Sequence, residues 1–513
     1  MSKPLVIVES PAKAKTIASF LGSDYEVEAS VGHVADLPSK GLAVDVDNHF
    51  KPTYELTERG AKIIKDLRRL VKNASAVYLA TDEDREGEAI SWHLIENLKS
   101  AIKPGTPVHR VVFHEITKAA IDHAFASPRD LDYGLVDAAE TRRILDRLFG
   151  YEVSPVLWRK VNRGLSAGRV QSPTIRLIVE RERERIAFKS AGYWGLDLVT
   201  DTQPSFKANL LEIDHQRVAT GKDFDSDGRT KSDVLVLEEA AVMSLVERLV
   251  NLPITVTSVE DKPYRSSPKA PFMTSTLQQE AGRKLRLSAQ QTMRTAQGLY
   301  ERGFITYMRT DSITLADEAL AAVRSHIQKE FGGDYLPSSP RTYLKKVKNA
   351  QEAHEAIRPT LPLRSPEEVA SQLNGPDLAL YRLIWQRTLA SQMPDARGVT
   401  VSIRLSATAV AGADQPSQDC TFAASGTTIT FQGHRRVYEE SRDDEGEAGE
   451  TEALLPILEV GSRVGVESFD PSGHETSPPP RYTEASIVKK LEELGIGRPS
   501  TWASIIQTVQ DRG

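Results

Sequence analysis

The sequence has almost no cysteine and no long apolar run. Its single cysteine, Cys420, excludes an internal disulfide framework and any zinc site built from several cysteines of this chain. No apolar stretch approaches the roughly 20 residues that a membrane-spanning helix needs. Met1–Pro4 leads directly into a short apolar segment, which is unlike a secretory signal. We therefore expect a folded protein of several domains with no membrane partner.

An excess of basic charge is also missing. The formal net charge is −6, which by itself disfavours a nucleic-acid-binding protein. Most of this negative charge is local, because the segment from Glu439 to Glu452 holds eight acids and one arginine. Its low apolar content predicts a solvated or disordered loop. The rest of the chain is close to neutral, which is compatible with a basic groove.

Acidic side chains follow two predicted strands. The apolar run Ala76–Ala80 is typical of a buried parallel strand, and Asp82, Asp84 and Glu86 alternate directly after it. While the chain stays extended, these three side chains face the same side. A second predicted strand ends at Glu9, just before a predicted helix. Open α/β sheets bind their ligands at the carboxyl ends of such strands.

Several converging carboxylates would suit Mg²⁺, which prefers oxygen ligands and usually keeps some of its water. Such an ion could neutralise a phosphate during transfer. The alternative is that each acid only caps the positive N-terminus of a helix. Capping needs one acid, so the metal interpretation is favoured for the set as a whole.

Tyr307 lies in the segment Gly303–Ser312, two residues before Arg309. A phenol titrates near pH ~10 and is a poor nucleophile at neutral pH. A neighbouring guanidinium could stabilise both a phenolate and the phosphate that it attacks. Together with a carboxylate cluster suited to a metal, this predicts phosphoryl transfer through a covalent tyrosyl intermediate.

Short motifs in a fixed order extend over almost the whole chain. They are Val8–Thr16, Gly32–Val34, Ala80–Glu88, Phe113–Thr117, Arg142–Arg147, Leu165–Ser172, Ser275–Glu280, Tyr307–Ser312, His354–Pro359 and Gly495–Thr501. As an ordered set they resemble the type IA DNA topoisomerases, specifically the bacterial topoisomerase I branch. That family often carries further C-terminal modules, and Gly513 ends what reads as a continuing element. We therefore expect a chain truncated at its C-terminus.

The resemblance implies a multidomain α/β and α+β fold that forms a toroid. A Toprim metal-binding domain with a Rossmann-like parallel sheet is expected over residues 1–131. A helical DNA-binding gate domain is expected over 132–190 and 474–513, and a tyrosine nucleophile domain over 265–394. Residues 191–264 and 395–473 would form a β-rich arch. Their β-like patterns lie on both sides of the tyrosine segment, which indicates that the chain leaves this domain and re-enters it.

The resemblance also implies an activity. The expected reaction is relaxation of negatively supercoiled DNA, dependent on Mg²⁺ and independent of ATP. One strand would be cut through a 5′-phosphotyrosine intermediate, the other strand passed, and the cut religated. The expected partners are single-stranded and negatively supercoiled DNA, and the expected protein is a monomer in the bacterial cytoplasm, associated with the nucleoid.

Roles carry over to individual residues from the resemblance. Tyr307 would be the nucleophile, Lys13 would assist proton transfer, and Arg309 would bind the phosphate. Glu9 would act as general acid and as a metal ligand. The remaining metal ligands would be Asp82, Asp84 and Glu86. The residues expected to contact DNA are His33, Arg142, Arg143, Arg147, Tyr151, Arg159, Arg169, Val170, Gln171 and His354.

Other interpretations stay open at this point. The arginines could form a salt-bridged surface helix with Glu140, Asp146 and Glu152, and His33 could be a structural hydrogen-bond donor. A topoisomerase III type of enzyme is an alternative within the family. A Toprim nuclease or primase would need the acids but no tyrosine. A non-catalytic scaffold for single strands would need only the arginines and stacking aromatic residues.

Overall fold

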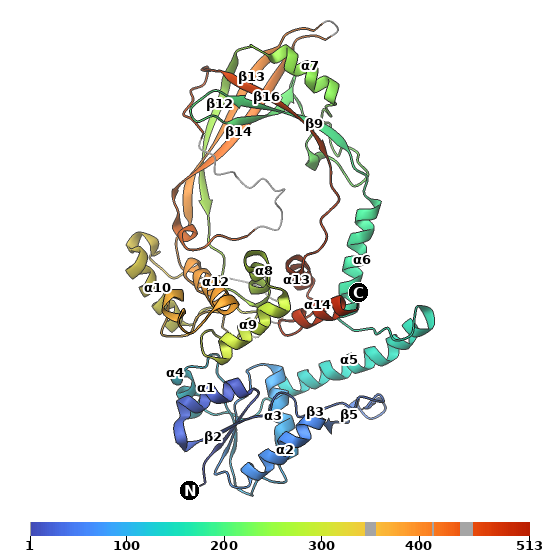
Figure 1. The fold of residues 1–513 in the computed structure, drawn as a ribbon, viewed down its shortest axis with the longest axis vertical. Coiled ribbons are helices and arrows are strands. Elements are labelled where there is room, and N and C mark those ends of the chain that lie inside the picture. The colour runs from blue at the N-terminus through green and yellow to red at the C-terminus, as the bar shows by residue number, and fades with distance from the viewer. Residues whose placement is uncertain (1, 344–354, 413–414, 442–454, 513) are drawn as a thin grey trace.

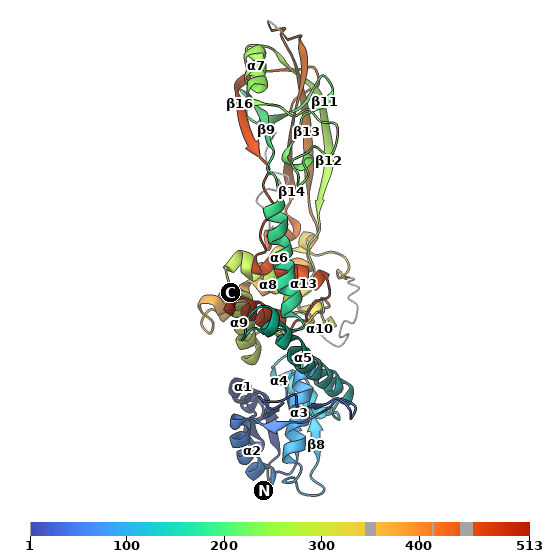
Figure 2. The same ribbon diagram turned by 90° about the vertical axis from the view of Figure 1, so that its right-hand side faces the viewer.

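The computed structural model describes residues 2–343, 355–412, 415–441 and 455–512. It consists of an α/β body joined to a ring of helices and a long antiparallel sheet (Figure 1). Seen from the side, the molecule is narrow and elongated (Figure 2). His354 and most of the acidic segment lie outside the described residues, so the predictions made for them have no structural counterpart. Among the described residues, no helix combines the length and apolar character needed to cross a membrane.

The N-terminal body is built on a four-stranded parallel sheet. Its strands are, in spatial order, β2 (Glu26–Ala29), β1 (Leu5–Val8), β7 (Val77–Leu79) and β8 (Val108–Arg110). Its helices are α1 (Pro11–Leu21), α2 (Glu58–Val71), α3 (Arg85–Leu98) and α4 (Lys118–Ala126). Two small ladders pair β3 (Ala35–Asp36) with β6 (Glu55–Leu56) and β4 (Val44–Asp45) with β5 (Lys51–Pro52). The central strands β1 and β7 are apolar because both of their faces are covered.

Helices follow this body in two separate parts of the sequence. They are α5 (Tyr133–Lys160) and α6 (Gln171–Ala187), and then α13 (Glu484–Glu493) and α14 (Trp502–Asp511). An apolar core that includes Val488, Leu491 and Trp502 joins the last two helices to Ala289. The C-terminal residues therefore pack back onto the middle of the chain, next to α6 (Figure 1).

One curved antiparallel sheet forms the far side of the ring. It contains β9 (Gly192–Thr200), β10 (Lys207–Ile213), β11 (Gln216–Arg217), β12 (Ile254–Ser266), β13 (Ala396–Ala409), β14 (Gln418–Phe431), β15 (Arg463–Val464) and β16 (Val466–Glu475). Strand β12 pairs with β13 and β9 pairs with β16, so segments from both sides of the tyrosine region share one sheet. The helix α7 (Glu239–Leu249), inside a block that we expected to be β-like, was not predicted.

The tyrosine region is helical. Its helices are α8 (Thr274–Leu285), α9 (Ala289–Glu301), α10 (Asp317–Phe331), α11 (Pro366–Val369) and α12 (Gly375–Ser391). Its core is continuous with that of the α/β body, because Val8, Ala80 and Phe113 belong to the same buried cluster as Tyr300 and Tyr307. The predicted fold class is confirmed by the parallel sheet, the helical regions and the single curved sheet. The shared core holds the tyrosine segment against the strand ends.

Candidate active site

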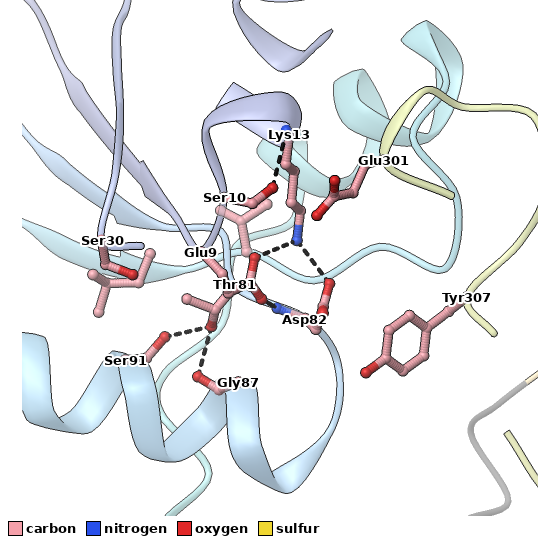
Figure 3. A network of polar contacts seen from close by, with 12 residues as sticks. Glu9, Ser10, Lys13, Ser30, Thr81, Asp82, Gly87, Ser91, Glu301 and Tyr307 are labelled. Carbon is pink, nitrogen blue, oxygen red and sulfur yellow. Dashed lines mark hydrogen bonds and ion pairs between the residues drawn. The ribbon is translucent and has the colours of Figure 1, made fainter. Parts of the chain in front are cut away.

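A buried charge network, made of Glu9, Lys13 and Asp82, lies where β1 and β7 end. Ser10 caps α1 by accepting a hydrogen bond from the amide of Lys13, so the lysine lies in the first turn, beside the strand that precedes it. The ammonium Nζ of Lys13 lies 3.0 Å from Glu9 Oε2 and 3.0 Å from Asp82 Oδ1. The other oxygen of Glu9 accepts from the backbone amide of Asp82 (Figure 3). One cation therefore bridges the two strand ends.

Burial and neighbouring charges shift the pKa values of Glu9 and Lys13. Burial and the nearby charge of Asp82 raise the pKa of Glu9 to about 7. Burial alone would lower the pKa of Lys13, but Asp82 and Glu9 outweigh it and raise that pKa above its usual value. The lysine therefore stays charged, while the Glu9 carboxyl is able to hold a proton near neutral pH.

Tyr307 points into the same region from the opposite side (Figure 3). Its backbone amide donates to the carbonyl of His114 at 2.8 Å, and its ring meets the ring of Tyr300 edge-on at 5.2 Å. Its hydroxyl donates to Asp84 Oδ2 at 2.6 Å. Burial and the charge of Asp84 raise the pKa of Tyr307 well above that of a free phenol. In this arrangement the side chain is a protonated phenol whose proton already faces a carboxylate.

Asp84 makes two contacts at once, one that was considered as a helix cap and one that was not predicted. Its Oδ1 accepts from the amide of Gly87 at 2.8 Å and so caps α3, while Oδ2 receives the hydroxyl of Tyr307. Arg309 approaches from the tyrosine side, with its guanidinium 3.8 Å from both Asp84 and Glu86. The capping alternative is therefore true of Asp84, and it does not exclude contact with the tyrosine.

The expectation that three acids alternate along an extended chain is wrong for Glu86. Helix α3 begins at Arg85, so Glu86 lies in its first turn and Asp84 is the last extended residue. Glu86 instead reaches Arg142 on α5 at 3.0 Å. Asp82 therefore pairs with Lys13, whereas Asp84 and Glu86 share Arg309 and Glu86 also binds Arg142.

A cavity of about 620 Å³ opens between the strand ends, α9 and the segment before α14. Glu9, Asp82, Asp84 and Glu86 all line it, and their oxygens are the donor type that a hard divalent cation prefers. No three acidic, histidine or cysteine side chains of the described chain are gathered closely enough to enclose a metal ion. The cavity therefore supplies oxygen donors of the kind that Mg²⁺ uses, without a ready cluster of three ligands among the described residues.

A buried arginine that we did not predict supports the acidic loop. Arg110, at the end of β8, is 1% exposed and donates to the backbone carbonyls of Thr81 and Asp82. It also pairs with Glu88 at 2.9 Å, and Glu88 in turn binds Arg129 at 2.8 Å. Only the folded sheet brings β8 beside β7, so no local sequence pattern identifies Arg110 as a partner of this loop.

Three of the arginines expected to bind DNA form ion pairs. Arg142 binds Glu86 at 3.0 Å, Arg143 binds Asp36 at 2.9 Å, and Arg169 binds Asp146 at 3.0 Å. The salt-bridge alternative named Asp146, but Glu86 and Asp36 come from the α/β body and not from the same helix. The pairs of Arg142 and Arg143 join α5 to the body, and that of Arg169 joins α5 to the segment before α6.

The other expected DNA contacts lie along the same helices. Arg147 donates to the carbonyl of Leu37 at 3.3 Å, and its guanidinium lies 5.3 Å from the centre of the Tyr151 ring. Arg159 is exposed on α5 and donates to the carbonyl of Pro155. Gln171 begins α6, just after its capping residue Val170.

His33 lines the cavity, and burial lowers its pKa. Sequence reasoning missed the wall opposite this residue. Helix α9 supplies Gln290, Arg294, Gln297 and Glu301 to that wall. Their spacing of three or four residues is the available signal, because it places polar side chains on one face of a helix.

Comparison with known proteins agrees with this geometry. A family model described as DNA topoisomerase matches residues 130–513, and one described as Toprim domain matches residues 4–116. DNA topoisomerase 1 of Mycolicibacterium smegmatis is 53% identical over 99% of this chain and 56% of the relative. That of Streptomyces coelicolor is 54% identical over 99% of this chain and 55% of the relative. The chain thus spans about half the length of these relatives.

The solved structures include a similar fold. The full-length topoisomerase I from Thermotoga maritima matches with a TM-score of 0.79 and 36% identity, over 99% of this chain and 78% of that one. The similarity to these proteins covers 99% of the chain, so it includes the ordered motifs, the parallel sheet and the tyrosine that faces the acids. The chain belongs to the bacterial topoisomerase I family of type IA DNA topoisomerases.

Proposed function

We propose that this chain is a type IA DNA topoisomerase that relaxes negatively supercoiled DNA without ATP and with Mg²⁺. The observation that carries the proposal is the 2.6 Å hydrogen bond from the Tyr307 hydroxyl to Asp84, beside the network of Glu9, Lys13 and Asp82. This contact supports a proposal in which a nucleophile, a proton acceptor and a proton donor act on one bound strand. A Toprim nuclease would have no use for the tyrosine at this position.

In the proposed cleavage step, the Tyr307 oxygen attacks the phosphorus of a single-stranded linkage and its proton passes to Asp84. The bond from phosphorus to the 3′-oxygen breaks, and Glu9 protonates that oxygen while Lys13 holds Glu9 in place. Arg309 binds the phosphate. The 5′-phosphate remains on Tyr307, which conserves the bond energy and removes the need for ATP. Religation reverses each transfer after the second strand has passed.

Asp82, Asp84 and Glu86, with Glu9, are the residues that would hold Mg²⁺. The ion would supply positive charge beside the phosphate during transfer. Three arginines would exchange their carboxylate partners for phosphates of the bound strand: Arg142, Arg143 and Arg169. Arg147 would exchange a backbone carbonyl for a phosphate. The proposed partners are single-stranded and negatively supercoiled DNA. We propose that the protein acts as a monomer on the nucleoid in the bacterial cytoplasm.

An oligonucleotide labelled at either end tests the proposal. The protein is incubated with the single strand and then denatured, and label is sought on the polypeptide. We expect protein-bound label only when the fragment on the 3′ side of the cut carries it, because Tyr307 keeps the 5′-phosphate. Free fragments without an adduct would identify a nuclease instead.

The variant Tyr307→Phe should lose the adduct while it continues to bind the strand, because only the nucleophilic oxygen is removed. Persistence of the adduct would reject Tyr307 as the nucleophile. Absence of both adduct and cleavage in the parent, with strand binding retained, would favour a non-catalytic scaffold.

A further inference from the structure

The cavity lined by Asp84, the hydrogen-bond partner of Tyr307, has an unfavourable charge for its proposed substrate. Its lining includes the carboxylates of Glu9, Asp82, Asp84, Glu86 and Glu301. The arginines of that lining are Arg294 and Arg309. A DNA backbone carries one negative charge at each phosphate, so every protein cation that is available in this cavity matters for binding.

The two arginines differ in what they already contact. Arg309 lies 3.8 Å from both Asp84 and Glu86. These two carboxylates already neutralise part of its positive charge. Arg294 is exposed and forms no hydrogen bond or ion pair with the described part of the chain. Arg302, near the end of the same helix, instead pairs with Asp377 of α12 at 2.6 Å. Of these three arginines, Arg294 alone offers the cavity an unused guanidinium.

The position of Arg294 on α9 fixes which part of a strand it could reach. It shares the cavity-facing side of the helix with Gln297 and Glu301. Seven residues separate it from Glu301, which corresponds to about 10 Å along the helix. The segment of Tyr307 and Arg309 follows the C-terminal end of α9, whereas Arg294 lies nearer the N-terminal end of that helix. In the proposed complex, Arg309 therefore contacts the reacting phosphate and Arg294 lies farther along the cavity. A neighbouring phosphate of the same strand is therefore the ligand within its reach.

We propose that Arg294 is a positioning residue that binds a backbone phosphate adjacent to the cleaved linkage. This inference rests on the proposed function, because it takes the cavity to be the site of the cleaved strand. The guanidinium fork matches two phosphate oxygens and reads no base, so the contact fixes the strand without adding sequence preference. It would hold the scissile linkage against Tyr307 while the protein carboxylates repel the backbone.

A salt titration separates this contact from a general effect of surface charge. Binding of a single-stranded oligonucleotide is measured in the Tyr307→Phe background, where no adduct can form. Adding Arg294→Gln should weaken binding about tenfold, because a charge-assisted contact is lost. It should also reduce the slope of log affinity against log salt by about 0.7, the value for one phosphate on a single strand.

Arg302→Gln is the matched control, since it removes the same charge from the C-cap of α9, from a side chain that pairs with Asp377. It should leave the salt slope unchanged. Arg294→Lys should keep the slope while it loses part of the affinity, because the charge remains and the fork does not. Equal slopes for the parent and for Arg294→Gln would overturn the inference, as would a parent that shows no salt-dependent binding.

Neutral methylphosphonate linkages locate the contact. They are introduced one position at a time, and each position is measured with the parent and with Arg294→Gln. At one position next to the linkage that would be cleaved, a neutral linkage should weaken strand binding by the parent. It should not weaken binding by Arg294→Gln, because that variant already lacks the guanidinium that contacts this phosphate. Equal losses in both proteins at every position would also overturn the inference. Adduct formation by the chain with Tyr307 intact is scored separately, so failure of the proposed function is distinguishable from failure of this contact.

Discussion

The buried charge network and the arginine face of α5, formed by Arg142 and Arg143, use ion pairs in opposite ways. In the network, Lys13 is 1% exposed and touches two carboxylates that belong to different strand ends. On the arginine face, the side chains of Arg143 and its partner Asp36 are 43% and 45% exposed. The first arrangement is enclosed by packed side chains, and the second remains in contact with water.

This difference determines which charges can change partners. Removing one member of a buried pair leaves an uncompensated charge and costs about 3–5 kcal/mol. Exposed pairs contribute only about 0–1 kcal/mol, so a phosphate can replace the carboxylate at little cost. The network is thus suited to hold a fixed arrangement of protons, and the arginine face is suited to exchange partners with a moving strand.

Glu9→Gln should produce the largest effect. The amide keeps the shape of the side chain but cannot protonate a leaving oxygen, and positioned acids contribute about 10²–10⁴-fold to rates. We expect the rate of adduct formation with excess enzyme to fall by about that factor, with strand binding retained. Glu96→Gln is a matched control on α3, because Glu96 is exposed and forms a surface pair with Lys99. A normal cleavage rate in Glu9→Gln would remove Glu9 from the reaction.

Arg110→Met should destabilise the α/β body strongly. The change leaves Glu88, which is fully buried, with Arg129 as its cationic partner in the described chain, and it removes the Arg110 donor from the carbonyls of the acidic loop. We expect a loss of about 3–5 kcal/mol, measured from the thermal transition of the protein. Lys118→Met breaks an exposed pair with Asp122 and should change the same transition by less than about 1 kcal/mol. Similar losses of unfolding free energy in both variants would mean that buried and exposed ion pairs contribute equally to stability.

Asp82→Ala combined with Asp84→Ala tests the metal assignment. Loss of residues that only support metal ligands costs about 10–100-fold in metal affinity, so loss of the ligands themselves should cost at least about tenfold. We expect the Mg²⁺ concentration for half-maximal relaxation to rise by that factor or relaxation to be lost. Lys13 would then retain only Glu9, so folding is checked by the thermal transition. Unchanged relaxation at low Mg²⁺ would argue against these ligands.

Local patterns predicted the parts of the site that depend on short segments. Strand ends followed by acids placed Glu9 and Asp82 at one edge, since the sheet is parallel. Contacts between distant segments escaped this reasoning. Arg110 reaches the acidic loop only through the pairing of β8 with β7, and Arg142 finds Glu86 across a domain junction. The early start of α3 at Arg85 depends on capping by Asp84, which competes with the extended pattern.

Arg143→Gln should have the smallest effect on the folded protein and a measurable one on binding. Its pair with Asp36 is exposed, so the thermal transition should shift by less than the equivalent of about 1 kcal/mol. If the guanidinium moves to a phosphate in the complex, the salt slope for a single strand should fall by about 0.7. The two measurements together test whether this arginine can exchange partners.

Asp36→Asn completes this test from the other side of the pair. It removes the carboxylate that competes with phosphate for Arg143, whereas the arginine itself remains. If the two anions compete, this variant should bind a single strand more tightly than the parent at low salt, by a few-fold at most because the pair is exposed. Weaker binding would mean that Asp36 orients the arginine for DNA, and the arginine face would then be a fixed arrangement like the buried network.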